Sequence, residues 1–138
     1  MKEQSESNLS DKIEQSQDQP CIDLTYLKQR TKSNPELMAE IISAYLVQTP
    51  PLISSMKQSL LDKDWDSLRA AVHKLIPSFA IMGISEEAEN SAKKIQEYTG
   101  TRLQIEELPT LVQQIDNVCT RACKELDVEL NRIKKTNQ

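Results

Sequence analysis

The chain has 138 residues, with 28% charged residues, only two glycines and a formal net charge of −4. This length allows one domain with a substantial core, and the scarcity of glycine beside abundant Leu, Ala, Lys, Glu and Gln favours an all-α protein. The acidic balance without a basic face argues against nucleic acid as a partner, and the lack of a long apolar run or an apolar leader predicts a cytoplasmic protein that does not contact membranes.

The first segment differs in composition from the rest of the chain. Residues 1–20 are polar and show no apolar period, which predicts a flexible N-terminal tail. Residues 21–138 are predicted to form a single helical domain. Its first element is a short helix of one or two turns that covers the domain as a lid, indicated by the apolar residues Ile22, Leu24 and Leu27.

A first long helix is predicted to start within residues 32–36 and to end near residues 62–64. Asn34 can cap its first backbone amides, and Pro35 suits the first helical position. Pro50 and Pro51 fall inside this helix. Because each proline removes an amide and crowds the carbonyl four residues before it, the sequence predicts a kink or a break just before this pair.

The second long helix is predicted from about Asp64 to Met82, with Gly83 able to end it in the left-handed conformation. Its apolar residues recur at spacings of three and four, so they lie on one stripe. The members of this stripe are Trp65, Leu68, Val72, Leu75, Phe79 and Met82.

Two further helices complete the predicted domain. A short third helix begins after the capping residue Ser85 and is predicted to end at Gly100, and a fourth runs from about Ile105 to Lys134 with Pro109 in its first turn. Four amphipathic segments with short connections predict an up-down antiparallel four-helix bundle with a short N-terminal lid helix and a long, overhanging C-terminal helix.

The three cysteines are interpreted as reduced packing residues. Cys119 and Cys123 lie four residues apart on one helix, where their Cβ atoms are about 6 Å apart, too far for a relaxed disulfide. A metal site would need more ligands than these and Cys21, and the only histidine is predicted on another helix. We therefore expect no metal site and no cofactor in this chain.

The only histidine, His73, lies in the middle of the second predicted helix. It projects about 140° from the centre of the apolar stripe, so it is expected to face solvent, where core packing does not explain it. Small and apolar residues surround it on the same face. Such an exposed patch is typical of a docking surface and comprises Ala70, Pro77, Ala80, Ile81 and Ile84.

The residues beside His73 suit a nucleophile more than a hydrolytic site. A neutral imidazole can attack phosphorus without a base, and no second histidine or carboxylate pair accompanies it. Lys74 and Arg69 can stabilise the added negative charge of a phosphorylated ring. Pro77 removes the amide that would bond the His73 carbonyl, and Ser78 can hydrogen-bond a carbonyl or orient the imidazole.

The run His73-Lys74-Leu75-Ile76-Pro77-Ser78, followed by Gly83, resembles the motif of histidine-containing phosphotransfer (HPt) domains. In that motif a histidine is followed by any residue, Leu, usually Lys, usually Gly, and Ser or Ala, with a glycine ten positions after the histidine. The predicted helix plan also matches this family, and the resemblance covers about residues 22–135.

The resemblance implies that His73 accepts a phosphoryl group from a receiver-domain aspartyl phosphate and passes it to another receiver. The chain would be a monomeric carrier and not an enzyme, with Mg²⁺ held by the partner receiver. The partners would be receiver domains of response regulators or hybrid histidine kinases. Lys74, Ser78, Arg69, Pro77 and Gly83 would support the phosphoacceptor. Receiver docking would involve Ala70, Ile76, Ala80, Ile81 and Ile84.

Two positions depart from the family pattern: Ile76 stands where Lys is usual, and Pro77 where Gly is usual. The missing lysine motivates a second hypothesis, a degenerate HPt-like bundle that binds a receiver or kinase without being phosphorylated. A third hypothesis is a hydrolase or phosphatase that uses His73 as a general base, and the absence of a partner carboxylate counts against it.

Overall fold

The computed structural model describes residues 20–136, and this part of the chain is all helical, as the composition predicts. Within it, no helix combines the length and apolar character that a membrane crossing requires. The predicted tail over residues 1–20 lies outside the described residues, apart from Pro20. The helices are α2 (Thr25–Thr31), α3 (Pro35–Asp62), α4 (Trp65–Met82), α5 (Glu86–Thr101) and α6 (Leu108–Thr136), with a 3₁₀ turn, η1 (Ile105–Glu107), before α6.

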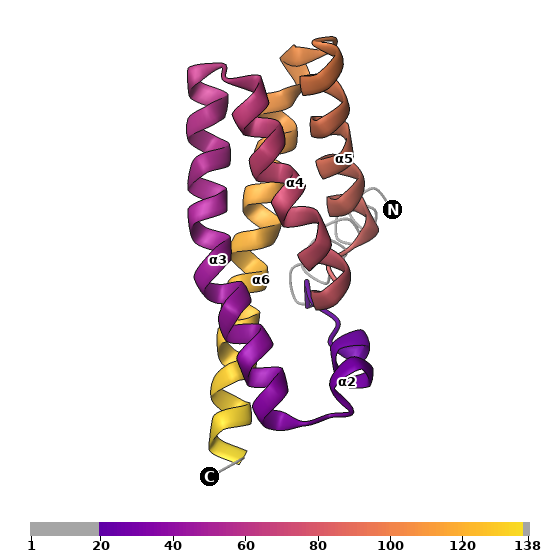
Figure 1. Cartoon of the computed structure of the whole chain (residues 1–138), viewed down its shortest axis with the longest axis vertical. Coiled ribbons are helices and arrows are strands. Elements are labelled where there is room, and N and C mark those ends of the chain that lie inside the picture. Colours follow the sequence, from indigo (N-terminus) through magenta and orange to yellow (C-terminus); the bar gives the residue numbers. More distant parts are fainter. Residues whose placement is uncertain (1–19, 137–138) are drawn as a thin grey trace, which may run out of the picture.

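The long helices pack side by side. The α3 helix contacts α4 and α6, and α5 contacts the same two helices. Successive long helices run in opposite directions, and α4 lies between α3 and α5 (Figure 1). The lower parts of α3 and α6 extend beyond α4 and α5, where the short α2 packs against α3 and α4 (Figure 1).

Side-chain caps begin three of the long helices at the predicted positions. Each cap accepts a hydrogen bond from the backbone N–H three residues later, which satisfies one of the amides that a helix start leaves unpaired. The caps are Asn34 for α3, Asp64 for α4 and Ser85 for α5, with donor–acceptor distances of 3.1, 3.2 and 3.4 Å.

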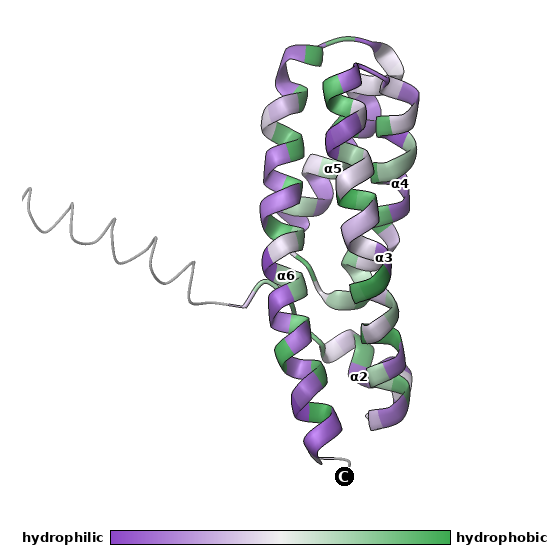
Figure 2. Ribbon diagram, turned by 90° about the vertical axis from the view of Figure 1, so that its left-hand side faces the viewer, coloured by the Kyte–Doolittle hydropathy of each residue, from purple (hydrophilic) through white to green (hydrophobic). Residues whose placement is uncertain are grey.

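The apolar stripe of α4 forms part of one hydrophobic core. Leu68, Val72, Leu75, Phe79 and Met82 are each at most 1% exposed, as their spacing predicts, whereas Trp65 at the start of the helix is only half-buried. Hydrophobic residues also recur along the other helices, with hydrophilic residues between them (Figure 2). A packed α4 therefore holds its outward residues on a rigid support.

Of the two alternatives predicted near Pro50, a kink or a break, the break does not occur. The α3 helix continues from Pro35 to Asp62 without interruption, and its axis turns partway along its length (Figure 1). Thr49 and Met56, on either side of the two prolines, are buried. Packing on α4 and α6 thus keeps the helix continuous despite the missing amides.

The predicted end of α5 at Gly100 is wrong. The helix continues to Thr101, and Arg102 adopts the left-handed conformation that ends it, with φ of 64°. A Cβ atom built at Gly100 would lie 3.8 Å from Cζ of Arg69 on α4. The Arg69 guanidinium therefore lies beside Gly100, at a distance that an added methyl group would tolerate.

Gly83 ends α4 as predicted, with φ of 65°. A Cβ atom at this position would overlap the carbonyl oxygen of Asp23, so the close approach of two backbones also requires glycine. The following N–H, that of Ile84, donates to the Phe79 carbonyl at 2.8 Å, and Ile84 is only 7% exposed. The expected exposure of Ile84 is therefore wrong, because the left-handed turn ends the helical periodicity and folds Ile84 back onto the core.

The segment before α2 is tied to two helices. The Asp23 N–H donates to the Met82 carbonyl at the end of α4, at 3.0 Å. The N–H groups of Cys21 and Ile22 both donate to Oε1 of Glu125 on α6, at 2.7 and 3.2 Å. These bonds position α2 against the end of α4.

Candidate functional site

His73 is exposed in the middle of α4, whereas its neighbours Val72 and Leu75 are buried. The outward direction of the imidazole predicted from helical periodicity is confirmed. Because α4 is packed through its buried stripe, the helix presents the ring from a fixed backbone.

Gln96 on α5 holds the imidazole from one side. Its Nε2 lies 2.9 Å from Nδ1 of His73, and the residue is half-buried between the two helices. Sequence reasoning missed this contact. The sequence does contain an indication of it. His73 and Gln96 lie at similar separations before and after the turn at Gly83, so they are expected at the same height on two adjacent antiparallel helices.

The orientation of the Gln96 amide determines which ring nitrogen carries the proton. With its NH₂ group toward the ring, Nδ1 accepts and the proton lies on Nε2. With the amide turned over, its oxygen accepts from Nδ1–H, and Nε2 keeps a free lone pair. In this second arrangement His73 is a nucleophile at its outer nitrogen.

The two cations predicted near His73 lie on opposite sides of α4. The Arg69 guanidinium lies over Gly100 on α5, the same side as Gln96. Lys74 instead lines a groove between α4 and α3. The structure therefore does not bring both cations to one side of the imidazole.

Ser78 makes one of its two predicted interactions. Its Oγ donates to the carbonyl of Leu75 at 2.6 Å, and no hydrogen bond joins it to His73 in the described part of the chain. The resemblance implied that Ser78 supports the imidazole, and Gln96 does so instead. Pro77 is exposed inside an uninterrupted α4.

The predicted docking residues form a smaller exposed surface than expected. Ala70, Pro77 and Ala80 are exposed, and Ile76 and Ile81 are half-buried. These five residues are called the α4 patch below. Their short or partly covered side chains leave the space around His73 open to a partner.

The cysteines offer no nucleophile near this site. All three are free thiols; Cys119 is buried, and Cys21 and Cys123 are half-buried. Burial raises the pKa of Cys119 to about 12, and it also raises the pKa of Cys21 and of Cys123. Residues 20–136 contain no group of three or more His, Cys, Asp or Glu side chains arranged to hold a metal ion.

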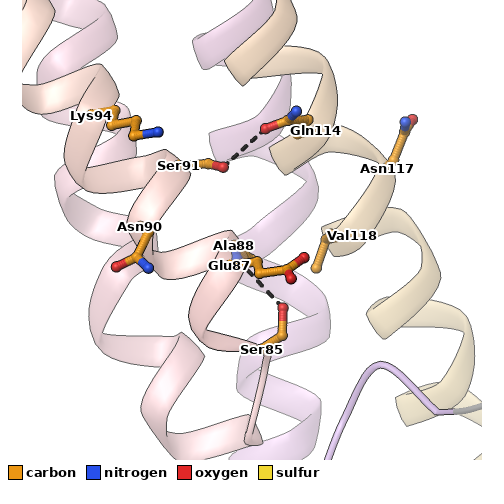
Figure 3. A pocket seen from close by; sticks show the side chains of 9 residues that line it. All are labelled: Ser85, Glu87, Ala88, Asn90, Ser91, Lys94, Gln114, Asn117 and Val118. Atoms are coloured by element: carbon orange, nitrogen blue, oxygen red, sulfur yellow. Dashed lines mark hydrogen bonds between the residues drawn. The ribbon is translucent and has the colours of Figure 1, made fainter. Parts of the chain in front are cut away.

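A separate polar groove lies between α5 and α6 (Figure 3). Ser91 donates to Oε1 of Gln114 across it at 2.9 Å, and Ser85 caps α5 at its lower end (Figure 3). Its side chains therefore link the two helices and complete a helix start. No residue predicted around His73 lines this groove.

Comparison with known proteins returns no match to a family model, a curated protein or a solved structure. The functional interpretation therefore depends on the geometry around His73 and on the resemblance of its motif to that of HPt domains.

Proposed function

We propose that this chain is a histidine phosphotransfer protein of a two-component phosphorelay. In this proposal α3 to α6 form an HPt-like up-down four-helix bundle with α2 as its lid, and His73 carries the phosphoryl group. The observation that supports it most is the exposed imidazole on a packed helix, held at Nδ1 by Gln96 so that Nε2 faces outward.

The reaction uses the free lone pair of Nε2. This lone pair attacks the phosphorus of a receiver's aspartyl phosphate, the N–P bond forms, and the P–O bond to the aspartate breaks as the carboxylate leaves with the electron pair. The ring then carries a positive charge. With the Gln96 amide turned so that its oxygen faces the ring, Nδ1–H donates a hydrogen bond to that oxygen. The same steps in reverse pass the phosphoryl group to a second receiver.

The receiver supplies the remaining chemistry. Its Mg²⁺ and catalytic groups act on the phosphoryl group, so this chain is a carrier, without a cofactor of its own and not an enzyme. As a cytoplasmic monomer it would dock receivers of response regulators or hybrid kinases through the α4 patch. Ala80→Arg is expected to weaken receiver binding without unfolding the domain, and an unchanged affinity would place the interface elsewhere.

The direct test is transfer of labelled phosphoryl from a phosphorylated receiver. The purified chain is mixed with the labelled receiver, and the label that it gains should be acid-labile and alkali-stable. His73→Gln should abolish this gain while circular dichroism and receiver binding stay unchanged. Absence of transfer to the unmodified chain would refute the proposal.

A second candidate function is receiver or kinase binding without phosphorylation. Ile76 favours it, since this half-buried apolar residue stands where HPt domains usually carry a phosphate-stabilising lysine. Docking without transfer would support this degenerate bundle. If no cation stabilises the phosphoryl group on the side of residue 76, Ile76→Lys is expected to speed phosphohistidine formation. An unchanged rate would mean that another residue supplies this cation.

A further inference from the structure

A groove of about 380 Å³ lies between α3 and α4. Lys74 and Ala70 line it from α4, and Ser55 and Ser59 line it from α3, one helical turn apart. A cation, two hydroxyl groups and a small residue thus face one space, and Ala70 and Lys74 lie three positions before and one position after His73 on α4.

Some polar side chains of this groove are bonded elsewhere, such as Gln58, which donates to Asp62 at 3.0 Å, and others are not. Within residues 20–136, Lys74 forms no ion pair, and the hydroxyls of Ser55 and Ser59 make no hydrogen bond. Ser59 is only 8% exposed as a residue, but its Oγ is not among the fully buried polar atoms without a partner, so the hydroxyl is accessible from the groove. By contrast, the Ser67 hydroxyl in the same groove donates to Asp64 at 2.7 Å. The Ser59 hydroxyl is therefore a donor open to a ligand in the groove.

The imidazole geometry directs Nε2 away from α5. Gln96 holds Nδ1 on the α5 flank, and α3 and α5 lie on opposite flanks of α4 (Figure 1). The two nitrogens of an imidazole point away from each other, so a ring held at Nδ1 from α5 turns Nε2 away from α5. Ala70, three residues before His73, is too small to block the path to the groove.

We propose that this groove holds the oxygens of the phosphoryl group on Nε2, an inference that rests on the proposed function. Lys74 supplies the cation, and the hydroxyls of Ser55 and Ser59 donate hydrogen bonds. This assignment accounts for Ile76, because helical spacing places residue 76 on the α5 flank with Arg69. In this chain the phosphate-binding groups lie on the α3 flank of α4 instead.

The groups match the ligand in charge and in hydrogen bonding. A phosphoryl group carries about −1.5 to −2 charges near neutral pH and only acceptor oxygens. An ammonium group and two hydroxyls provide donors, and charge-assisted bonds of this kind are the stronger ones. The same donors stabilise charge on the equatorial oxygens during transfer.

The test uses phosphoramidate, a small donor that requires no receiver. The Nε2–P bond forms as the P–N bond of the donor breaks, and ammonia leaves with the electron pair. Lys74→Gln is expected to lower the initial rate of phosphohistidine formation about fivefold to tenfold, and Ser59→Ala about threefold. Lys93→Gln removes an equal charge on α5, where Lys93 pairs with Glu89 at 2.8 Å, and should change this rate less than twofold.

Amide chemical shifts locate the phosphoryl group independently of the rates. On phosphorylation, the ¹H–¹⁵N signals of Ser55 and Ser59 should shift more than those of Gly100 and Thr101. Equal rates for Lys74→Gln and Lys93→Gln, or larger shifts on α5, would overturn the groove assignment and leave the proposed function intact. If the unmodified chain forms no more phosphohistidine than the His73→Gln blank, both the groove assignment and the proposed function are refuted. Lys74 is exposed, so its variant is expected to fold, which circular dichroism checks.

Discussion

Replacement of the two glycines by alanine, one at a time, should change stability in opposite directions. At Gly83, a φ of 65° costs an L residue about 1 kcal/mol. The new Cβ would also overlap the Asp23 carbonyl oxygen, so the segment before α2 has to move. That movement breaks the bond from the Asp23 N–H to Met82, a loss of about 1 kcal/mol, with further loss of packing. We expect Gly83→Ala to lower the free energy of unfolding by about 2–4 kcal/mol.

Gly100 is the matched control. It lies inside α5, and the nearest atom to its added Cβ is Arg69 Cζ at 3.8 Å, an ordinary contact distance. Gly100→Ala should therefore raise the free energy of unfolding by about 0.5–1 kcal/mol through helix propensity. Urea denaturation followed by circular dichroism measures both values. A neutral Gly83→Ala would refute the close approach of Asp23, and a destabilising Gly100→Ala would refute the helical position of Gly100.

Three further predictions concern the site, the core and the N-terminal segment. Gln96→Leu should slow phosphohistidine formation on His73 about fivefold, which corresponds to the loss of one hydrogen bond of about 1 kcal/mol. Gln96→Glu keeps a hydrogen-bond acceptor beside Nδ1 and should slow it less. Equal rates for the two variants would contradict the role of Gln96. Because burial raises the pKa of Cys119 from 9.0 to about 12, the folded chain keeps a proton that the unfolded chain loses in this range. The free energy of unfolding should therefore fall by up to about 1.4 kcal/mol per pH unit between these two pKa values. If this dependence on pH is as steep in Cys119→Ala, the Cys119 thiol is not its cause. Glu125→Ala should speed hydrogen exchange of the amides before α2, whereas Asp127→Ala, on the exposed side of α6, should not.

The helix ends were predictable because their causes are local. Asn34, Asp64 and Ser85 cap amides only three residues away, and Gly83 tolerates a positive φ that other residues adopt at a cost. These interactions form within one stretch of chain. The starts of α3, α4 and α5 and the end of α4 therefore agree with the predictions.

Three features of the helices were left open or wrongly predicted from the sequence. Near Pro50 the axis of α3 turns but the predicted alternative of a break does not occur, because packing against α4 and α6 keeps the helix continuous. Gly100 does not end α5; the helix runs on to Thr101, and Arg102 ends it with a φ of 64°. Ile84 is buried because helical spacing no longer applies after the left-handed turn at Gly83.

The sequence alone determined that the described chain is helical and that His73 faces outward, because the periodicity of apolar residues along one helix is visible in one dimension. Only the tertiary structure brought Gln96 to Nδ1 and placed Arg69 and Lys74 on opposite flanks of the ring. Such contacts depend on the rotation and register of one packed helix against the next, which the spacing of residues within a single helix does not specify.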